Sequence, residues 1–85
     1  MPNENTWQAG FKLHVDKAGR NWIWSEALAC NVAIRQPTLS DAYKASMMSL
    51  AHYALMYKED RDRLREQLET LRIANEKVFR ERKDT

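Results

Sequence analysis

A stretch without glycine or proline, from Thr38 to about Arg82, limits the fold of this chain more than any other feature. Its residues are mostly Ala, Leu, Met, Glu, Lys, Arg and Gln, which favour the helix, and Thr38-Leu-Ser-Asp41 has the form of a helix-capping box. As one helix the stretch would be about 65 Å long, at about 1.5 Å per residue. A chain of 85 residues cannot cover such a helix alone, so the sequence predicts a long helix that needs a partner.

An apolar seam with a seven-residue repeat runs along this predicted helix. One set of positions recurs every seven residues: Tyr43, Leu50, Tyr57, Leu64, Leu71 and Val78. A second set falls between them: Met47, Ala54, Arg61, Leu68 and Asn75. This alternating spacing is typical of the a and d positions of a coiled coil, in which a buried Asn fixes the register.

We expect the seam before Tyr57 to pack on the chain's own core and the seam after Lys58 to pair with a second copy. The expected dimerisation residues are Tyr57, Leu64, Leu68, Leu71, Asn75 and Val78. The alternative is an amphipathic helix that packs on its own N-terminal domain. The charged run from Lys58 to Arg63 is the one place where the helix could break into a hairpin.

Length and composition indicate a single small domain with a marginal core. The single cysteine permits no internal disulfide, so a reducing, cytoplasmic setting is expected. No apolar run approaches the length of a membrane span, and residues 1–6 do not have the pattern of a signal peptide. The net charge of +2 is a weak electrostatic footprint for nucleic acid.

A β-hairpin is predicted from Trp7 to Trp24, after a flexible tail of residues 1–6. The turn chemistry lies between Val15 and Arg20, where Gly19 suits a left-handed position. An isolated two-stranded hairpin is barely stable, so its apolar face must cover something else.

The register implied by this turn sets Leu13 near Trp22 and Phe11 near Trp24. One face would then hold Trp7, Phe11, Leu13, Val15, Trp22 and Trp24. Ile23 is the exception, on the polar face. We expect the aromatic face to close the core as a lid, and the alternative is a platform on which a ligand stacks.

The segment of residues 25–44 begins with Ser25, which can cap a short helix from Glu26 to about Asn31. The whole segment resembles the helix-turn-helix of the Cro- and repressor-like DNA-binding families. Ala29 matches the small residue of the first helix in that family. Val32 and Ile34 match the apolar pair around the turn, and Leu39 and Ala42 match the apolar anchors of the second helix.

The resemblance implies that polar side chains near the start of the second helix reach base edges and phosphates in the major groove. In this sequence those residues are Arg35, Gln36, Thr38, Ser40 and Lys44. One copy offers few phosphate contacts, so a coiled-coil dimer would supply the affinity and set the half-site spacing. The first hypothesis is a small dimeric transcriptional regulator that binds double-stranded DNA.

The second hypothesis is a non-enzymatic protein–protein interaction module, such as an adaptor or a small inhibitor of a larger protein, of the kind that mobile elements encode. It would bind through the coiled coil or through the Tyr/Met face of the helix, which holds Met47, Met48, Met56, Tyr43, Tyr53 and Tyr57. The alternative for this face is burial beneath the hairpin.

Residues that carry catalytic or metal chemistry are sparse. Cys30 is alone, and neither His14 nor His52 has another ligand at metal-binding spacing. The only glycines are Gly10 and Gly19, so no glycine-rich phosphate loop is present. We therefore expect neither an enzyme nor a cofactor.

The expected fold is mainly α: an N-terminal β-hairpin, a short helix, then one long C-terminal helix with a coiled-coil seam. The expected division is a tail over residues 1–6, a core with the helix-turn-helix over residues 7–57, and a dimerisation helix over residues 58–85.

Overall fold

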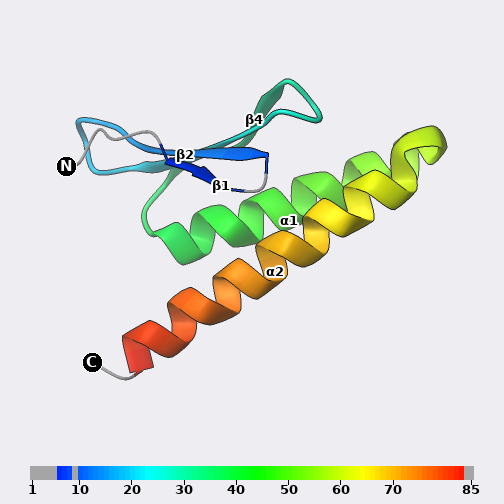
Figure 1. Ribbon diagram of the computed structural model, residues 1–85. Coiled ribbons are helices and arrows are strands. Elements are labelled where there is room, and N and C mark those ends of the chain that lie inside the picture. The colour runs from blue at the N-terminus through cyan, green and yellow to red at the C-terminus, as the bar shows by residue number, and fades with distance from the viewer. Residues whose placement is uncertain (1–5, 9, 84–85) are drawn as a thin grey trace.

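The computed structural model describes residues 6–8 and 10–83. Four strands come first: β1 (Thr6–Gln8), β2 (Phe11–Val15), β3 (Asn21–Ser25) and β4 (Cys30–Gln36). The helices follow: α1 (Leu39–Met56), the short 3-10 helix η1 (Lys58–Asp60) and α2 (Arg61–Lys83). The strands form one antiparallel sheet in the order β1-β2-β3-β4, and both helices lie on the same side of it (Figure 1).

This α+β architecture contradicts the expected fold. A mainly α chain with a short helix and one long C-terminal helix is wrong on two counts. The segment expected to form the short helix is a turn followed by the start of strand β4, and the long helix is divided at η1. The tail expected over residues 1–6 lies outside the described residues, except for Thr6 in β1.

The β2–β3 hairpin forms where its turn chemistry predicts it. The Asp16 carboxylate accepts hydrogen bonds from the backbone N–H groups of Ala18 and Arg20, both at 2.9 Å. Gly19 has a φ of 79°, which glycine adopts without strain. A backbone hydrogen bond of 3.0 Å from Asp16 to Arg20 closes the turn, so the strands pair directly outside these two residues.

The register of this hairpin differs by one residue from the expected register. Leu13 lies opposite Ile23, and His14 lies opposite Trp22. A shift of one residue exchanges the two faces of a strand. Ile23 is therefore fully buried, although the expected register puts it on the polar face. Trp22 and Trp24 lie on the opposite face, so the expected aromatic lid is wrong for both.

Residues after Ser25 form a turn and strand β4 instead of a short helix. The Ser25 hydroxyl oxygen accepts a hydrogen bond from the Leu28 N–H at 3.3 Å, as a helix cap does. The chain leaves this turn at Ala29, whose φ is 52°, and then pairs with β3. The β-branched residues Val32 and Ile34 favour a strand, and β3 has a free edge that a strand can satisfy.

Helix α1 begins where the sequence predicts. Thr38 is the N-cap, and its hydroxyl oxygen accepts a hydrogen bond from the Asp41 N–H at 3.0 Å. The helix ends at Met56, and the chain turns at η1, inside the charged run that the sequence marks as the place for a hairpin. Helix α2 then runs back along α1 (Figure 1).

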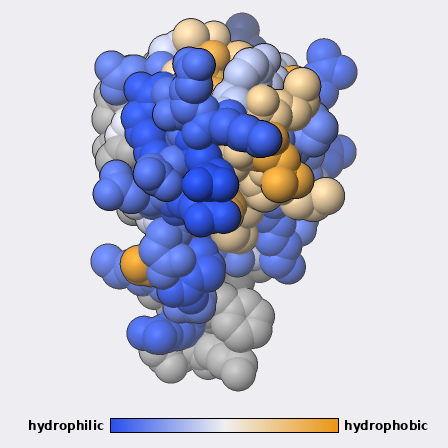
Figure 2. All heavy atoms as spheres, turned by 90° about the vertical axis from the view of Figure 1, so that its right-hand side faces the viewer, coloured by the Kyte–Doolittle hydropathy of each residue, from blue (hydrophilic) through white to orange (hydrophobic). Residues whose placement is uncertain are grey.

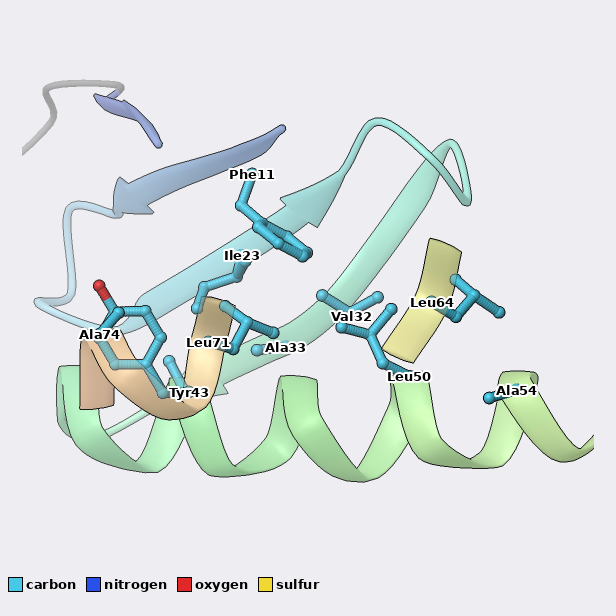
Figure 3. Close-up of a cluster of buried hydrophobic side chains, with 11 residues drawn as sticks. Phe11, Ile23, Val32, Ala33, Tyr43, Leu50, Ala54, Leu64, Leu71 and Ala74 are labelled. Atoms are coloured by element: carbon cyan, nitrogen blue, oxygen red, sulfur yellow. The ribbon is translucent and has the colours of Figure 1, made fainter. Parts of the chain in front are cut away.

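The core lies between the sheet and the two helices (Figure 3). Its buried side chains come from β2, β3, β4 and both helices: Phe11, Ile23, Val32, Ala33, Ala42, Tyr43, Leu50, Ala54, Leu64, Leu71 and Ala74. The expected domain boundary at residue 58 thus falls at the turn between two helices that share one core.

Candidate functional site

The residues expected to contact DNA do not lie on one helix. Arg35 and Gln36 end strand β4, ahead of α1. Gln36 is hydrogen-bonded at the edge of the sheet: its carbonyl accepts a hydrogen bond from Asn21 Nδ2 at 3.3 Å, and its Nε2 donates to the Ile34 carbonyl at 2.9 Å. Of this pair, only Arg35 presents an exposed side chain.

The other three expected DNA contacts belong to the start of α1. Thr38 caps the helix, and the Ser40 hydroxyl donates a hydrogen bond of 2.8 Å to Asn75 Oδ1 on α2. Only Lys44 is exposed among them. Because Cys30–Gln36 is a strand, the described residues contain no helix ahead of α1 with which it could form a helix-turn-helix. Double-stranded DNA binding and the family resemblance stay predictions.

The residues expected to pair with a second copy are mostly used within the chain. Four of them pack in or against the core: Leu64, Leu68, Leu71 and Val78. Asn75 accepts the Ser40 hydrogen bond described above, so it joins two helices of one chain. Tyr57 is the exception, because it is exposed and its ring stacks on Tyr53 with centroids 5.7 Å apart.

Large apolar side chains are exposed on the outer side of the C-terminal half of α1 and at the end of the molecule where α1 turns into α2. We call this surface the helix-end patch; it consists of Met48, Leu55, Met56 and Tyr57. Figure 2 views this end of the molecule and shows hydrophobic residues gathered beside hydrophilic ones. Met48 and Leu55 are seven residues apart on α1 and therefore share one side of it. The sequence placed Met48, Met56 and Tyr57 on the Tyr/Met face, a candidate binding surface with burial beneath the hairpin as its alternative. These three side chains are exposed, whereas Tyr43 of the same face is buried.

A second candidate surface is the sheet face that neither helix covers. We call it the tryptophan face; its described residues are Lys12, His14, Trp22, Trp24 and Arg35. The register places Lys12 opposite Trp24 and His14 opposite Trp22. Both tryptophans are half-buried. The sequence did not predict this surface, because the expected register places both tryptophan rings on the face that covers the core.

Trp22 is held from two directions. Its Nε1 donates a hydrogen bond of 2.7 Å to Asp16 Oδ2, and the Arg35 guanidinium carbon lies 6.0 Å from the ring centroid. The hydrogen bond from Trp22, assisted by the N–H of Arg20, lowers the pKa of the Asp16 carboxyl below its usual value. In the core, burial raises the pKa of the Tyr43 phenol.

The described residues offer little for metal binding. Within residues 6–8 and 10–83, no group of three or more His, Cys, Asp or Glu side chains could hold a metal ion. Cys30 is half-buried and not in a disulfide. Among the described helices, none is long and apolar enough to cross a membrane.

Comparisons of the chain with family models, curated proteins and solved structures found no match. The two surfaces above are therefore interpreted from their own chemistry.

Proposed function

We propose that the protein is a small, non-enzymatic interaction module that forms a homodimer through the helix-end patch. The observation that carries the proposal is the exposure of Leu55 and Met48, whose exposed fractions are 79% and 74%. Full burial of one such side chain contributes about 1.5–3 kcal/mol. A surface that gathers several of them favours contact with another protein surface.

The charges around the patch support a second copy as the partner. The run that forms η1 and starts α2 carries three acidic and three basic side chains, all exposed: Lys58, Glu59, Asp60, Arg61, Asp62 and Arg63. A twofold interface places one surface against itself, so a rim of mixed sign attracts its copy whereas a rim of one sign repels it. The Arg63–Asp60 ion pair, at 3.4 Å, illustrates how readily these opposite charges meet.

The dimer proposed here differs from the coiled coil expected from the sequence. The C-terminal seam is occupied within the chain, and the contact moves to the outer side of α1 and the turn after it. The proposal retains a cytoplasmic setting, where the lone Cys30 stays reduced.

Sedimentation equilibrium over a range of protein concentrations tests the proposal. We expect the wild-type mass to rise from monomer toward dimer below about 1 mM, the concentration at which about 4 kcal/mol of association becomes visible. The variant Leu55→Glu places a charge in the patch and is expected to stay monomeric. Ile73→Glu is the matched control, because Ile73 is also exposed, at 54%, but lies on α2 about 18 Å along the helix from its start.

Two outcomes contradict the proposal. A wild-type protein that stays monomeric over the whole range excludes a second copy as the occupant of the patch. Equal loss of association in Leu55→Glu and Ile73→Glu shows a general effect of added charge. Circular dichroism melts of both variants establish that each one is folded.

A further inference from the structure

The tryptophan face is the sheet surface that neither helix covers, on the other side of the molecule from the helices. Both helices pack on the opposite face, against Phe11, Ile23 and Val32 (Figures 1 and 3). Antiparallel sheets often leave one face to water, but that face then carries polar side chains. Here its described part includes two tryptophans on one strand. This surface is separate from the helix-end patch, and its function does not depend on the proposed dimer.

Trp22 and Trp24 are spaced for separate stacking contacts. Two residues along a strand are about 6.6–6.8 Å apart on the same face, so each ring can meet a different planar group. Trp22 is also fixed in position by its hydrogen bond to Asp16. A ring that is already held in place loses little conformational freedom when a ligand stacks on it.

An irregular stretch of β4 brings a cation to this face. The β3–β4 register shifts between Asn21 and Ile23, so two residues, Ile34 and Arg35, lie where one would pair with Trp22. Arg35 has a φ of 51°, which residues other than glycine rarely adopt. Such bulges re-aim side chains and are common beside functional sites. Here the bulge leaves the guanidinium over the Trp22 ring.

The charge of the face favours an anionic ligand. Lys12 and Arg35 lie on it, and the adjoining turn adds the exposed Lys17 and Arg20. Two acids are described near the face: Asp16 is engaged by the Trp22 indole and two backbone N–H groups, and Glu26 is exposed two residues beyond Trp24, so the four basic side chains still outnumber the acidic ones. Aromatic rings between cations form the surface that single-stranded nucleic acids bind, because each base offers a flat face and each nucleotide a phosphate.

We infer that the tryptophan face binds single-stranded nucleic acid, with bases stacked on Trp22 and Trp24 and phosphates near Lys12 and Arg35. A duplex is the poorer ligand because its base faces are hidden within the stack. Half-buried rings on a sheet also cannot reach base edges in a groove.

Fluorescence anisotropy of a labelled 20-nucleotide oligothymidylate tests the inference, with a duplex of equal length as the comparison. The full chain is used. We expect the single strand to bind more tightly than the duplex. With two or three phosphates neutralised, affinity falls about tenfold between about 50 mM and about 200 mM salt.

Two pairs of variants separate stacking from charge. Trp24→Leu keeps an apolar side chain but removes the ring, and is expected to weaken single-strand binding about 5- to 150-fold, whereas Trp24→Phe keeps most of the affinity. Arg35→Asn removes the positive charge but introduces a residue that tolerates positive φ. It is expected to reduce the slope of log affinity against log salt concentration by the amount that corresponds to about one phosphate contact. Its control, Arg35→Lys, keeps the slope.

Three results overturn the inference. The first is no binding of the oligonucleotide at about 50 mM salt by wild-type protein that is folded. The second is equal affinity for duplex and single strand together with equal affinity of Trp24→Leu and Trp24→Phe, because binding is then through phosphates alone. The third is a change in the mass of the protein caused by Trp24→Leu without oligonucleotide binding, which assigns the face to a protein interface.

Discussion

Ser46 is a buried polar residue whose replacement should stabilise the protein. It lies on α1, is fully buried, and its hydroxyl oxygen has no hydrogen-bond partner among the described residues. A buried hydroxyl left without a partner costs about 1–3 kcal/mol. Replacement by alanine also gains about 0.5 kcal/mol of helix propensity. We therefore expect Ser46→Ala to raise the free energy of unfolding by about 1.5–3.5 kcal/mol, and the melting temperature by roughly 6–28 °C.

Ser49, three residues further along the same helix, provides the matched control. Its hydroxyl donates a hydrogen bond of 3.1 Å to the Val32 carbonyl on β4. Ser49→Ala loses about 0.5–1.5 kcal/mol with that hydrogen bond and regains about 0.5 kcal/mol of propensity. We expect this variant to be unchanged or destabilised by up to about 1 kcal/mol.

Urea denaturation followed by tryptophan fluorescence measures both variants against the wild type. The slope of free energy against urea should be the same in all three, because the surface exposed on unfolding hardly changes. Equal changes in the two variants would show that only helix propensity is at work. A loss of stability in Ser46→Ala would show that a bound water or a helix carbonyl satisfies the Ser46 hydroxyl.

Two further predictions concern hydrogen bonds that join separate elements. Because the folded pKa of Asp16 is depressed, its stabilising contribution is present above the usual carboxyl value of 3.8 and is lost as pH falls through the lower folded value. The indole N–H resonance of Trp22 in an NMR titration should shift below pH 3.8, and Asp16→Asn should abolish that shift. Ser40→Ala and Asn75→Ala should each lower the free energy of unfolding by about 1 kcal/mol, because each variant loses the same hydrogen bond. A double-mutant cycle measured by denaturation should give a coupling energy of about 0.5–1.5 kcal/mol between the two residues, and strictly additive losses would refute this prediction.

In the β2–β3 hairpin the sequence predicted the position of the turn but not the register of the strands. Asp16 and Gly19 predicted the turn correctly, because their chemistry acts locally. The register did not follow, because Trp22, Ile23 and Trp24 are all apolar and the polar ends of the strand, Asn21 and Ser25, share the face of Ile23, which is the buried one. The tryptophan face therefore became visible only when the pairing was known.

Strand β4 shows a tertiary contact overriding local helix signals. Ser25 does accept the hydrogen bond of a cap, so the local signal was real. The segment nevertheless turns at Ala29, because the free edge of β3 offers hydrogen-bonding partners to its backbone groups. The positive φ values at Ala29 and Arg35 could not be predicted, because neither position is a glycine.

The seven-residue seam predicted the buried side of both helices but not which chain would cover it. Leu50, Leu64 and Leu71 would face the same kind of surface in a coiled coil and in a helical hairpin. Association with a second copy costs about 4–15 kcal/mol of translational and rotational freedom, whereas a short turn costs far less. A continuous seam would also bury Arg61, a charge with a high desolvation cost. In the hairpin Arg61 is exposed beside the turn, so the charged residue that interrupts the seam is also the place where the chain folds back on itself.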